Sequence, residues 1–400
     1  MMKKIGLLCM LVPFVFNTLN IQAFITKFVS ANAAQSFAYL NVILIIIGTV
    51  IFFKHKESFA PIIKLWIWFF VFYYIIGTIA SEIHNTDSPY LKTLIPLIYF
   101  LGYSVFLSVA EFRPLFIKVC TVAFFVSSIM VIIFQRMNFS MDHDGIYEYV
   151  LERAGGVYGD ANQAALVSIL SYILIFYFFK PESKFFKALK FIALLIAVYA
   201  LVLTFSKTGF LVLLVVLGLT FHKLFSAKKI LVTAVIVPII FIAGINFALK
   251  SDTLSVLQKG RIENVVNILT FNTGKVEMSG RDMLLQNMLK YVYDNPILGN
   301  GIYFSNIIRG HNTIIGVWAD AGIVCFLLFL LILFSYFRKS LSSKSDTAYF
   351  SLSIMLAMTV FMLSLQTIIN QPYLLCLLVF LCYHVERSLT DPEAQAAVRV

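Results

Sequence analysis

Long apolar runs recur along almost the whole chain, and they constrain its fold more than any other feature. A membrane-spanning helix needs about 20 predominantly apolar residues, because the hydrocarbon core of a bilayer is about 30 Å thick. Hydrophobic residues make up 60% of the 400-residue chain and charged residues 13%, against roughly 45–50% and about 25% in soluble domains. The sequence therefore indicates an integral membrane protein. Disordered, disulfide-stapled and cytosolic-enzyme classes are excluded.

The apolar runs predict twelve spanning helices in an all-α, polytopic fold. The expected spans cover residues 5–25, 37–53, 61–80, 92–110, 115–134, 163–179, 188–204, 208–221, 230–249, 313–336, 347–367 and 371–386. Nine spans thus lie in 1–249, a long loop follows over 250–312, three spans lie in 313–387, and residues 388–400 form a short polar tail. An even number of spans places both termini on one side of the membrane.

Lysine and arginine residues fall in every second connection between these spans. The basic connections carry Lys3, Lys4, Lys54, Lys56, Arg113, Lys180, Lys184, Lys187, Lys223, Lys228, Lys229, Arg338, Lys339, Lys344 and Arg387, and the alternate short connections only Lys27 and Lys92. Short cytoplasmic loops of membrane proteins are enriched in basic residues. The pattern therefore predicts cytoplasmic termini. It also explains the net charge of +11 without a nucleic-acid partner.

The first apolar run has two interpretations. Two lysines precede it and Ala31-Asn32-Ala33 resembles a small-residue cleavage site, as in a secretory signal peptide. However, the run is longer than a typical signal core, and Asn17 and Asn20 lie near its end. We favour a first spanning helix, with cleavage of the N-terminus left open.

The cysteines carry no sign of metal binding or disulfide pairing. All five lie inside apolar segments, without a Cys-x-x-Cys motif or a histidine at metal-ligand spacing: Cys9, Cys120, Cys325, Cys376 and Cys382. We expect them to be small buried apolar residues, and we predict neither a metal nor a cofactor.

Two predicted outward loops are long, over 135–162 and 250–312, whereas the cytoplasmic loops are short. The second contains apolar residues at the spacing of one helix face: Leu284, Leu285, Met288, Leu289 and Val292. Ser279 is placed to cap this helix, and Asp294-Asn295-Pro296 ends it. We expect an amphipathic helix on the membrane surface or packed over the bundle. The function is therefore expected on the outward side.

Four outward clusters contain residues suited to chemistry. The first is Arg153-Ala154-Gly155-Gly156 with Tyr158-Gly159-Asp160-Ala161-Asn162. Glycines allow close approach of a ligand to the backbone, and arginine suits bidentate phosphate binding. A glycine-rich loop with an Asx turn is the alternative, and the residues alone leave both open.

The second and third clusters each contain one cation. Lys207 lies in Thr204-Phe205-Ser206-Lys207-Thr208-Gly209, between two spans, where a lysine also reaches the interface without any function. Arg281 lies in Ser279-Gly280-Arg281-Asp282, at the start of the predicted surface helix. An arginine in a first turn opposes the helix dipole, which argues against a role in local stability. An ion pair with Asp282 or Glu277 is the alternative.

The fourth cluster is Arg309-Gly310-His311-Asn312, just before a span that contains Trp318 and Asp320. Ionisable groups at membrane depth are candidates for function, and histidine is suited to general-base chemistry near neutral pH. A helix-capping histidine is the alternative. The other five histidines lie in loops or at span ends, where we expect them to be solvated.

The sequence has neither a nucleotide-binding Gly-x-x-x-x-Gly-Lys-[Ser/Thr] loop nor a His-Glu-x-x-His zinc motif. A reaction at the outward face therefore needs a substrate that arrives already activated. A lipid-diphosphate donor fits this requirement, because outward cations stabilise its leaving group.

Taken in order, these motifs resemble the O-antigen ligase/polymerase superfamily. The resemblance rests on Arg153-x-Gly-Gly-x-x-x-Asp160-x-Asn162-x-x-Ala, Thr204-x-Ser206-Lys207-x-Gly209, Gly280-Arg281, Pro296-x-x-Gly299-x-Gly301, and His311-Asn312 followed by Gly322. These motifs extend over about 150–325. The span layout with one large late outward loop fits the whole chain.

The resemblance implies a metal-independent, GT-C-like glycosyltransferase in the bacterial inner membrane, with its active site facing the periplasm. Its donor would be an undecaprenyl-diphosphate-linked glycan. The acceptor would be lipid A–core for a ligase, or another lipid-linked repeat for a polymerase. Arg281, Lys207 and Arg153 would bind the diphosphate and His311 would activate the acceptor. The expected substrate-binding residues are Asp160, Asn162, Arg309 and Asn312.

Two residues depart from the family pattern. Lys207 stands where the family usually has arginine, so the charge is kept and the bidentate fork is lost. Cys325 stands where ligases often have threonine, which weakens the choice of ligase over polymerase. A twelve-helix secondary transporter is a third hypothesis, which would require paired broken helices in two similar halves. The polar clusters gather instead on one face, and the halves look dissimilar.

Overall fold

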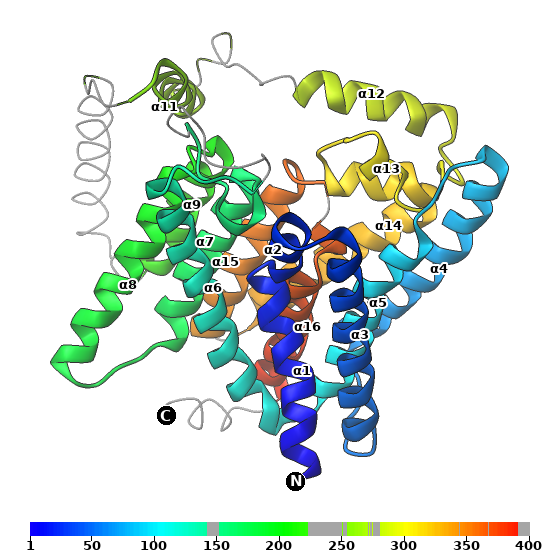
Figure 1. Cartoon of the computed structure of the whole chain (residues 1–400), viewed down its shortest axis with the longest axis horizontal. Coiled ribbons are helices and arrows are strands. Elements are labelled where there is room, and N and C mark those ends of the chain that lie inside the picture. Colours follow the sequence, from blue (N-terminus) through cyan, green and yellow to red (C-terminus); the bar gives the residue numbers. More distant parts are fainter. Residues whose placement is uncertain are drawn as a thin grey trace. The chain divides into compact units, whose positions relative to one another are not determined.

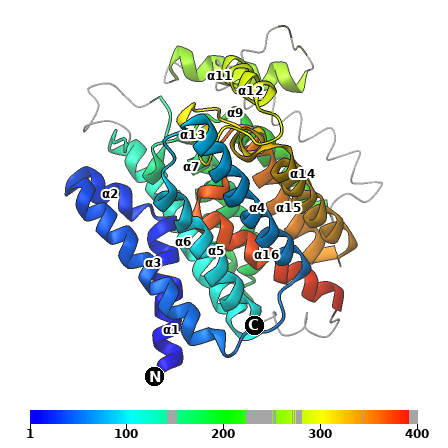
Figure 2. The same ribbon diagram turned by 90° about the vertical axis from the view of Figure 1, so that its right-hand side faces the viewer.

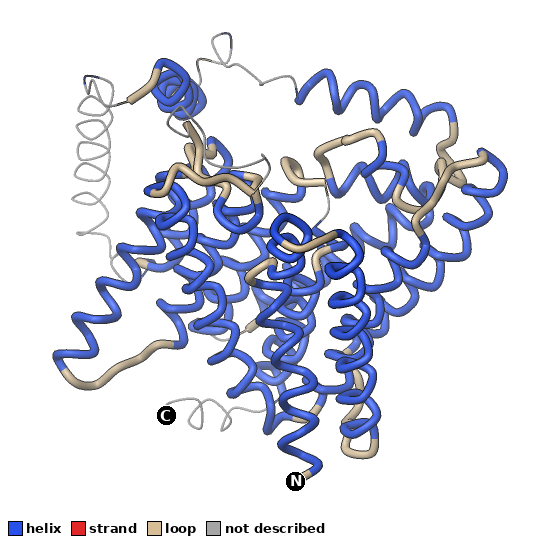
Figure 3. The backbone as a smooth tube through the Cα atoms, in the orientation of Figure 1, coloured by secondary structure: helices blue, strands red, loops and turns tan. Residues whose placement is uncertain are grey.

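The computed structural model describes residues 1–141, 152–222, 250, 254–270, 272, 274, 281–343, 345–366 and 368–390. Within these ranges the secondary structure is helical, with α-helices joined by turns and short 3-10 helices and no strand (Figure 3). The chain forms two compact units, unit 1 with residues 1–123 and 279–400 and unit 2 with residues 124–278. The expected all-α class is confirmed.

The helices of each unit are labelled in Figure 1. Unit 1 contains α1 (Met2–Thr18), α2 (Ile21–Phe28), α3 (Ala31–Phe53), α4 (Pro61–His84), α5 (Tyr90–Ser108), η1 (Ala110–Phe112), the start of α6 (Arg113–Arg136), α12 (Arg281–Asp294), α13 (Phe304–Ile307), α14 (Thr313–Ser342), α15 (Ser345–Met362), η5 (Ile368–Asn370) and α16 (Pro372–Thr390). Unit 2 contains the rest of α6, η2 (Gly156–Tyr158), α7 (Ala161–Phe178), α8 (Lys184–Leu203), α9 (Lys207–Thr220) and α11 (Val256–Leu269).

The length and apolar composition of the helices indicate a multi-pass membrane protein. In the described part of the chain, seven helices are long and apolar enough to cross a bilayer, and the bent pair α1–α2 brings the number to eight. Three shorter apolar helices fall on the expected spans 208–221, 347–367 and 371–386. The expected span 230–249 lies outside the described residues.

The first expected span, 5–25, is not one straight helix. It divides into α1 and α2, whose axes differ by 63°. The break lies at Asn20, whose φ of 50° is left-handed. Asparagine tolerates this conformation better than most residues. The sequence pattern detected the apolar run but not the bend within it.

The basic connections of unit 1 meet at one end of the bundle. The contacts that show this join Lys3 to Glu111 at 2.6 Å, the Arg113 guanidinium to the Tyr383 ring at 4.8 Å, and Lys339 to Glu386 in an ion pair. The opposite end carries the connection after α4 and the chain around α13, seen away from the N-terminus in Figure 2. There Thr86 Oγ1 donates to the Asn300 carbonyl at 2.6 Å. Basic residues and candidate functional residues thus occupy opposite ends of this unit.

An aromatic cluster packs α4, α5 and α14 together. Trp66 is 1% exposed, and its ring lies between 5.4 and 6.0 Å from those of Phe69, Phe70, Phe100 and Phe329. Its indole N–H donates to Tyr336 Oη at 3.2 Å, so the polar edge of the ring is satisfied. This packing fixes α14 beside α4. Helix α14 contains two residues with non-helical backbone angles, Ala321 and Gly322.

Candidate functional site

Helix α14 is broken eight residues after it begins. Ala321 (φ −135°, ψ 21°) and Gly322 (φ 72°, ψ −174°) leave helical geometry inside Thr313–Ser342. The conformation of Gly322 is essentially restricted to glycine. The sequence predicted a continuous span over 313–336. The structure corrects this prediction, because Gly322 divides the helix into a short N-terminal part and a longer C-terminal part.

The segment Pro296–Gly301 supplies the hydrogen bonds that this break removes. Asn300 N donates to the Ala319 carbonyl at 2.8 Å, and Gly301 N donates to the Asp320 carbonyl at 3.0 Å. Ile323 N donates to the Pro296 carbonyl at 3.0 Å. Irregular backbone at membrane depth is tolerated where protein groups satisfy it. The loop and the broken helix therefore form one interlocked element.

Glycines make the close approach of these two segments possible. A Cβ atom on Gly322 would collide with the Ile297 carbonyl oxygen, and one on Gly299 would lie 2.7 Å from the Asp320 carbonyl. Gly299 also has a φ of 78°, which disfavours any side chain. The same close approach of the two segments thus requires glycine at Gly299, in the motif Pro296-x-x-Gly299-x-Gly301, and at the distant Gly322.

Hydroxyl groups at the end of α4 and just after it hold the same loop, and sequence reasoning did not single them out. Ser81 Oγ accepts from Ile302 N at 3.0 Å, and Ser88 Oγ donates to the Ile302 carbonyl at 2.9 Å. A signal existed in the sequence, since hydroxyl residues recur at the outward end of the span 61–80.

Asp320, the last helical residue before the break, is 3% exposed. One carboxyl oxygen accepts from Tyr73 Oη at 2.8 Å, and the other accepts from Ser305 N at 2.6 Å. Burial, together with the nearby Asp320 carboxyl, raises the pKa of Tyr303. Tyr303 therefore stays protonated at neutral pH. The sequence selected Asp320 as an ionisable group at membrane depth, and the structure gives it a positioning role toward the segment that leads to His311.

His311 lies in a tight turn between α13 and α14. Its φ is 48° and that of Arg309 is 53°. His311 N donates to Gln366 Oε1 at 3.4 Å, and Gln366 Nε2 donates to the Ser305 carbonyl. Gln366 was missed by sequence reasoning, although a single carboxamide near the end of the apolar run 347–367 was a usable signal. The His311 side chain is half-buried.

The neighbours of His311 have distinct positions. Asn312 is buried and caps α14, accepting from Ile315 N at 3.0 Å. The side chain of Arg309 is exposed. The capping role considered for His311 thus belongs to Asn312.

Backbone strain concentrates in the predicted motifs. In the described ranges, seven residues other than glycine have a positive φ; three are asparagines, and the other four are Phe205, Tyr303, Arg309 and His311. Such conformations cost about 1–3 kcal/mol each and cluster at functional sites. All four lie next to, or within, segments that the sequence selected.

Helix α12 matches the predicted amphipathic helix. Met288 and Val292 are fully buried and pack against Ala319 of α14. This contact places α12 over the N-terminal part of α14, as in the expected alternative of packing over the bundle. Arg281 is the first residue of α12, and its side chain lies outside the described residues, as does Ser279.

In unit 2, the first and second sequence clusters come together. Arg153 Nε donates to the Thr204 carbonyl at 3.1 Å, and Arg153 Nη2 donates to Asn162 Oδ1 at 3.4 Å. Ser206 Oγ donates to the same Asn162 oxygen at 2.8 Å. Residues 44 positions apart, Asn162 and Ser206, are therefore in direct contact, and Arg153 joins the loop before α7 to the turn before α9.

Both helices that begin at this contact are capped by side chains. Asp160 Oδ1 accepts from Asn162 N at 2.7 Å and from Gln163 N at 2.8 Å, and Ser206 Oγ accepts from Gly209 N at 3.1 Å. The Asx-turn interpretation holds for Asp160. Lys207 is the first residue of α9. A cation at a helix N-terminus favours the binding of anions.

The basic connection of unit 2 lies at its other end. Lys190 Nζ, in the first half of α8, donates to the Phe176 carbonyl near the end of α7 at 2.7 Å. Arg153, Asn162 and Ser206 lie where α7 begins and α8 ends. Each unit therefore separates its short basic connections from its candidate functional residues.

Within the described ranges, no group of three or more His, Cys, Asp or Glu side chains is placed to hold a metal ion. The five cysteines are buried and unpaired with one another, as expected. The candidate groups are therefore cations at two helix starts, capped helix ends and a half-buried histidine in a strained turn. Such groups suit stabilisation of a departing anion and transfer of one proton.

A known protein family matches part of the chain. Residues 192–330 match a family model described as O-antigen ligase. The matched range covers about a third of the chain and contains Lys207, Arg281 and His311, as well as the break in α14. No curated protein matches the chain.

Proposed function

We propose that the protein is an O-antigen ligase of the O-antigen ligase/polymerase superfamily, because residues 192–330 match a family model described as O-antigen ligase. It transfers a glycan from undecaprenyl diphosphate to a sugar hydroxyl of lipid A–core at the periplasmic face of the inner membrane. The observation that carries the proposal is the family match over 192–330, because this range contains Lys207 and Arg281, two of the three proposed diphosphate-binding cations, and the strained turn with His311.

The proposed reaction is a displacement at the anomeric carbon of the donor sugar. The acceptor hydroxyl oxygen forms a bond to that carbon while the bond to the diphosphate oxygen breaks. His311 accepts the hydroxyl proton, and Arg281 and Lys207 neutralise the charge that develops on the departing diphosphate. Groups arranged for charge that develops only in the transition state give a large part of enzymatic rate enhancement.

The remaining predicted residues divide by their contacts. Asp160 and Asn312 cap helices, and Asn162 receives hydrogen bonds from Arg153 and Ser206. We assign these residues to positioning of the substrate-binding backbone. Arg309 is exposed beside His311, so we assign it to contact with substrate. Arg153 donates through Nε to the Thr204 carbonyl and through Nη2 to Asn162 Oδ1, and we assign its positive charge to the diphosphate.

A polymerase of the same superfamily is the second candidate. Cys325 favours it, because ligases often have threonine at this position. Cys325 is fully buried three residues after the break in α14. We therefore assign Cys325 to the packing of the broken helix, because its side chain does not reach solvent.

A transporter is disfavoured by the way the break in α14 is closed. In transporters, unwound carbonyls coordinate ions. Here the Ala319 and Asp320 carbonyls accept hydrogen bonds from Asn300 and Gly301. The family match also favours a transferase over a transporter.

The decisive experiment is a lipopolysaccharide gel of a deletion strain, combined with analysis of its undecaprenyl-linked glycans. Loss of a ligase leaves long glycans on the undecaprenyl carrier and none on the core. Loss of a polymerase leaves single repeats attached to the core. Unchanged lipopolysaccharide and unchanged carrier glycans would exclude both functions. A purified protein that transfers glycan in the presence of a chelator would support metal independence.

A further inference from the structure

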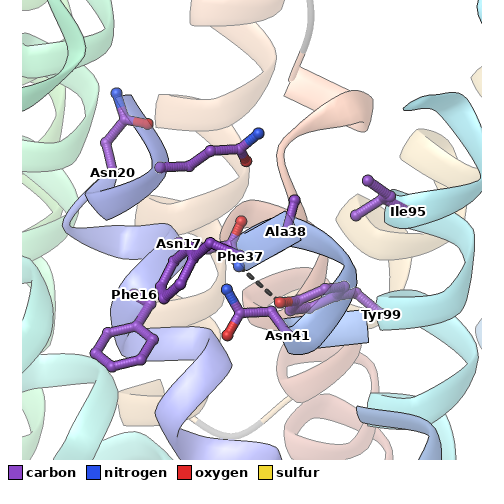
Figure 4. Close-up of a pocket in the computed structure, with 9 residues that line it drawn as sticks. Phe16, Asn17, Asn20, Phe37, Ala38, Asn41, Ile95 and Tyr99 are labelled. Carbon is purple, nitrogen blue, oxygen red and sulfur yellow. Dashed lines mark hydrogen bonds between the residues drawn. The ribbon is translucent and has the colours of Figure 1, made fainter. Parts of the chain in front are cut away.

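A polar pocket lies in unit 1, apart from the segments discussed above. It is a small cavity of about 30 Å³ between α1, α2, α3 and α5 (Figure 4). Its lining consists of four carboxamides, one phenol and apolar side chains: Asn17, Asn20, Gln22, Asn41, Tyr99, Phe16, Phe37, Ala38 and Ile95. None of these residues carries a charge, although polar groups dominate the surface inside the pocket.

Asn41 distinguishes this pocket from an ordinary polar gap between helices. Its side chain is only 4% exposed, and its Oδ1 atom has no hydrogen-bond partner among the described residues. The neighbouring Asn17 is satisfied, because its Nδ2 donates to Tyr99 Oη at 2.7 Å and to the Pro13 carbonyl at 2.9 Å. Buried polar atoms nearly always have a partner. Asn41 therefore points to a group that donates a hydrogen bond inside the pocket.

The pocket lies at the same end of unit 1 as the His311 turn. Ile95 lies in the first half of α5 and Tyr99 at its middle, and the start of α5 follows the connection that holds Asn300 and Ile302. The α1–α2 bend forms the other wall. Helix α5 also contacts η5, and Ile368 of η5 donates through its backbone to Thr313 Oγ1 at 3.4 Å. One helix thus connects the pocket with the start of α14.

The lining selects the chemistry of the ligand. An anionic phosphate would require cations, and none lines the pocket. Carboxamides and a phenol both donate and accept hydrogen bonds, which suits hydroxyl groups. Phe16 and Phe37, with ring centroids 5.3 Å apart, provide apolar faces beside them. The volume is about two to three times the roughly 10–15 Å³ that one water needs, so it has room for one or two hydroxyl groups at the edge of a sugar and not for a whole saccharide.

We propose that this pocket binds the hydroxyl edge of an uncharged sugar carried by a glycolipid, with Asn41 Oδ1 as the acceptor for one sugar hydroxyl. The chemistry is shared by two sources, the glycan of a lipid-linked substrate and the headgroup of an ambient neutral glycolipid. The proposal does not depend on glycosyl transfer. The experiment that tests it therefore measures binding of the sugar and not enzymatic activity.

The test uses the full-length protein in phosphatidylcholine nanodiscs and a photoreactive alkyl glucoside, with cross-linked peptides mapped by mass spectrometry. We expect cross-links to concentrate on residues 16–22 and 37–41. A phosphocholine probe with the same alkyl chain should not label them. Asn41→Leu should lower the glucoside labelling about 5- to 10-fold, as for the loss of one hydrogen bond.

Two further variants keep the test interpretable. Gln22→Leu removes another lining carboxamide whose side chain is exposed, so its effect does not depend on folding, and it should also lower the labelling. Gln35→Leu is the matched control, because Gln35 lies on α3, is exposed and donates to Tyr39 Oη at 2.8 Å outside the pocket. It should label like the parent protein.

Several results would overturn the proposal. Labelling spread evenly over lipid-facing helices, or equal labelling by the phosphocholine probe, would show ordinary membrane lipid. An Asn41→Leu protein with a raised melting temperature and unchanged labelling would show a pocket for ordered water only. If labelling is specific, competition by purified undecaprenyl-linked glycan identifies a substrate as the source, and competition only by a neutral diacyl glycolipid identifies the membrane.

Discussion

Tyr73 donates its phenolic hydrogen to the carboxyl group of Asp320 at 2.8 Å, although the two residues are 247 positions apart. Both side chains are almost fully buried, and Tyr73 Oη also accepts from Tyr303 N at 3.4 Å. A single phenol thus connects α4, the residue before the break in α14, and the segment leading to His311. The position of the candidate base depends on this long-range contact.

Tyr73→Phe should therefore destabilise unit 1 by about 1–3 kcal/mol, because it leaves a buried carboxyl oxygen without its donor. Thermal unfolding in detergent measures the effect. Tyr74→Phe is the matched control; Tyr74 Oη donates to the Thr93 carbonyl and not to a buried carboxyl group, and Tyr74 is half-buried, so the loss of stability should be smaller. Equal losses for the two variants would contradict a special role for the Tyr73–Asp320 contact.

Gly322→Ala should destabilise the protein by more than about 3 kcal/mol. The new Cβ combines a backbone conformation that is essentially restricted to glycine with a collision against the Ile297 carbonyl. Gly218→Ala is the control, since Gly218 lies within α9 with no atom near its added Cβ. That change should be neutral or slightly stabilising. Yield and melting temperature of the two variants provide the comparison.

The separation of basic ends from motif ends leads to a topology prediction. All five native cysteines are buried, so single introduced cysteines give a clean signal. Gln286→Cys on α12 should react with an impermeant maleimide in intact spheroplasts, whereas Ser342→Cys at the end of α14 should react only after permeabilisation; both positions are exposed. The reverse pattern would place the candidate site in the cytoplasm and remove the basis for a periplasmic transferase.

Arg281→Ala should reduce glycan transfer roughly 100- to 1000-fold at normal protein level, as expected when one contact to a developing oxyanion is lost. Arg281→Lys should restore activity only in part, because lysine lacks the guanidinium fork. Lys207→Arg should be tolerated. Lys290→Ala is the control, because Lys290 is an exposed cation on the same helix. If a purified Arg281→Ala protein transferred glycan at the rate of the parent protein, Arg281 would be only a surface charge without a role in the reaction.

His311→Ala should abolish transfer without loss of folded protein, since the His311 side chain is half-buried and its backbone N makes the contact to Gln366. His84→Ala, at the exposed end of α4, should have no effect. If His311 is the base, the parent activity should fall as the pH drops below the range in which histidine is neutral. An active His311→Ala protein with an unchanged pH profile would assign the proton transfer to another group.

The sequence by itself predicted the all-helical membrane class, the position of α12 and the separation of basic and motif-bearing ends. These properties follow from local hydropathy and charge, because the bilayer acts on each segment almost independently of its neighbours. The contact of Asn162 with Ser206 was not predicted from the sequence, which placed their two clusters only on the same side of the membrane. Its geometry, with Arg153 bridging to the Thr204 carbonyl, came from the fold.

Tertiary structure alone decided the break in α14, its closure by Pro296–Gly301, and the parts played by Tyr73, Ser81 and Gln366. Hydropathy cannot predict these features, because the segment 313–336 is apolar whether or not the helix is continuous. The break is stable only because distant N–H groups, those of Asn300 and Gly301, meet the freed carbonyls. In the sequence, the residues that make this break possible are isolated glycines and hydroxyl residues far apart along the chain. Only the folded structure shows that they contact one another.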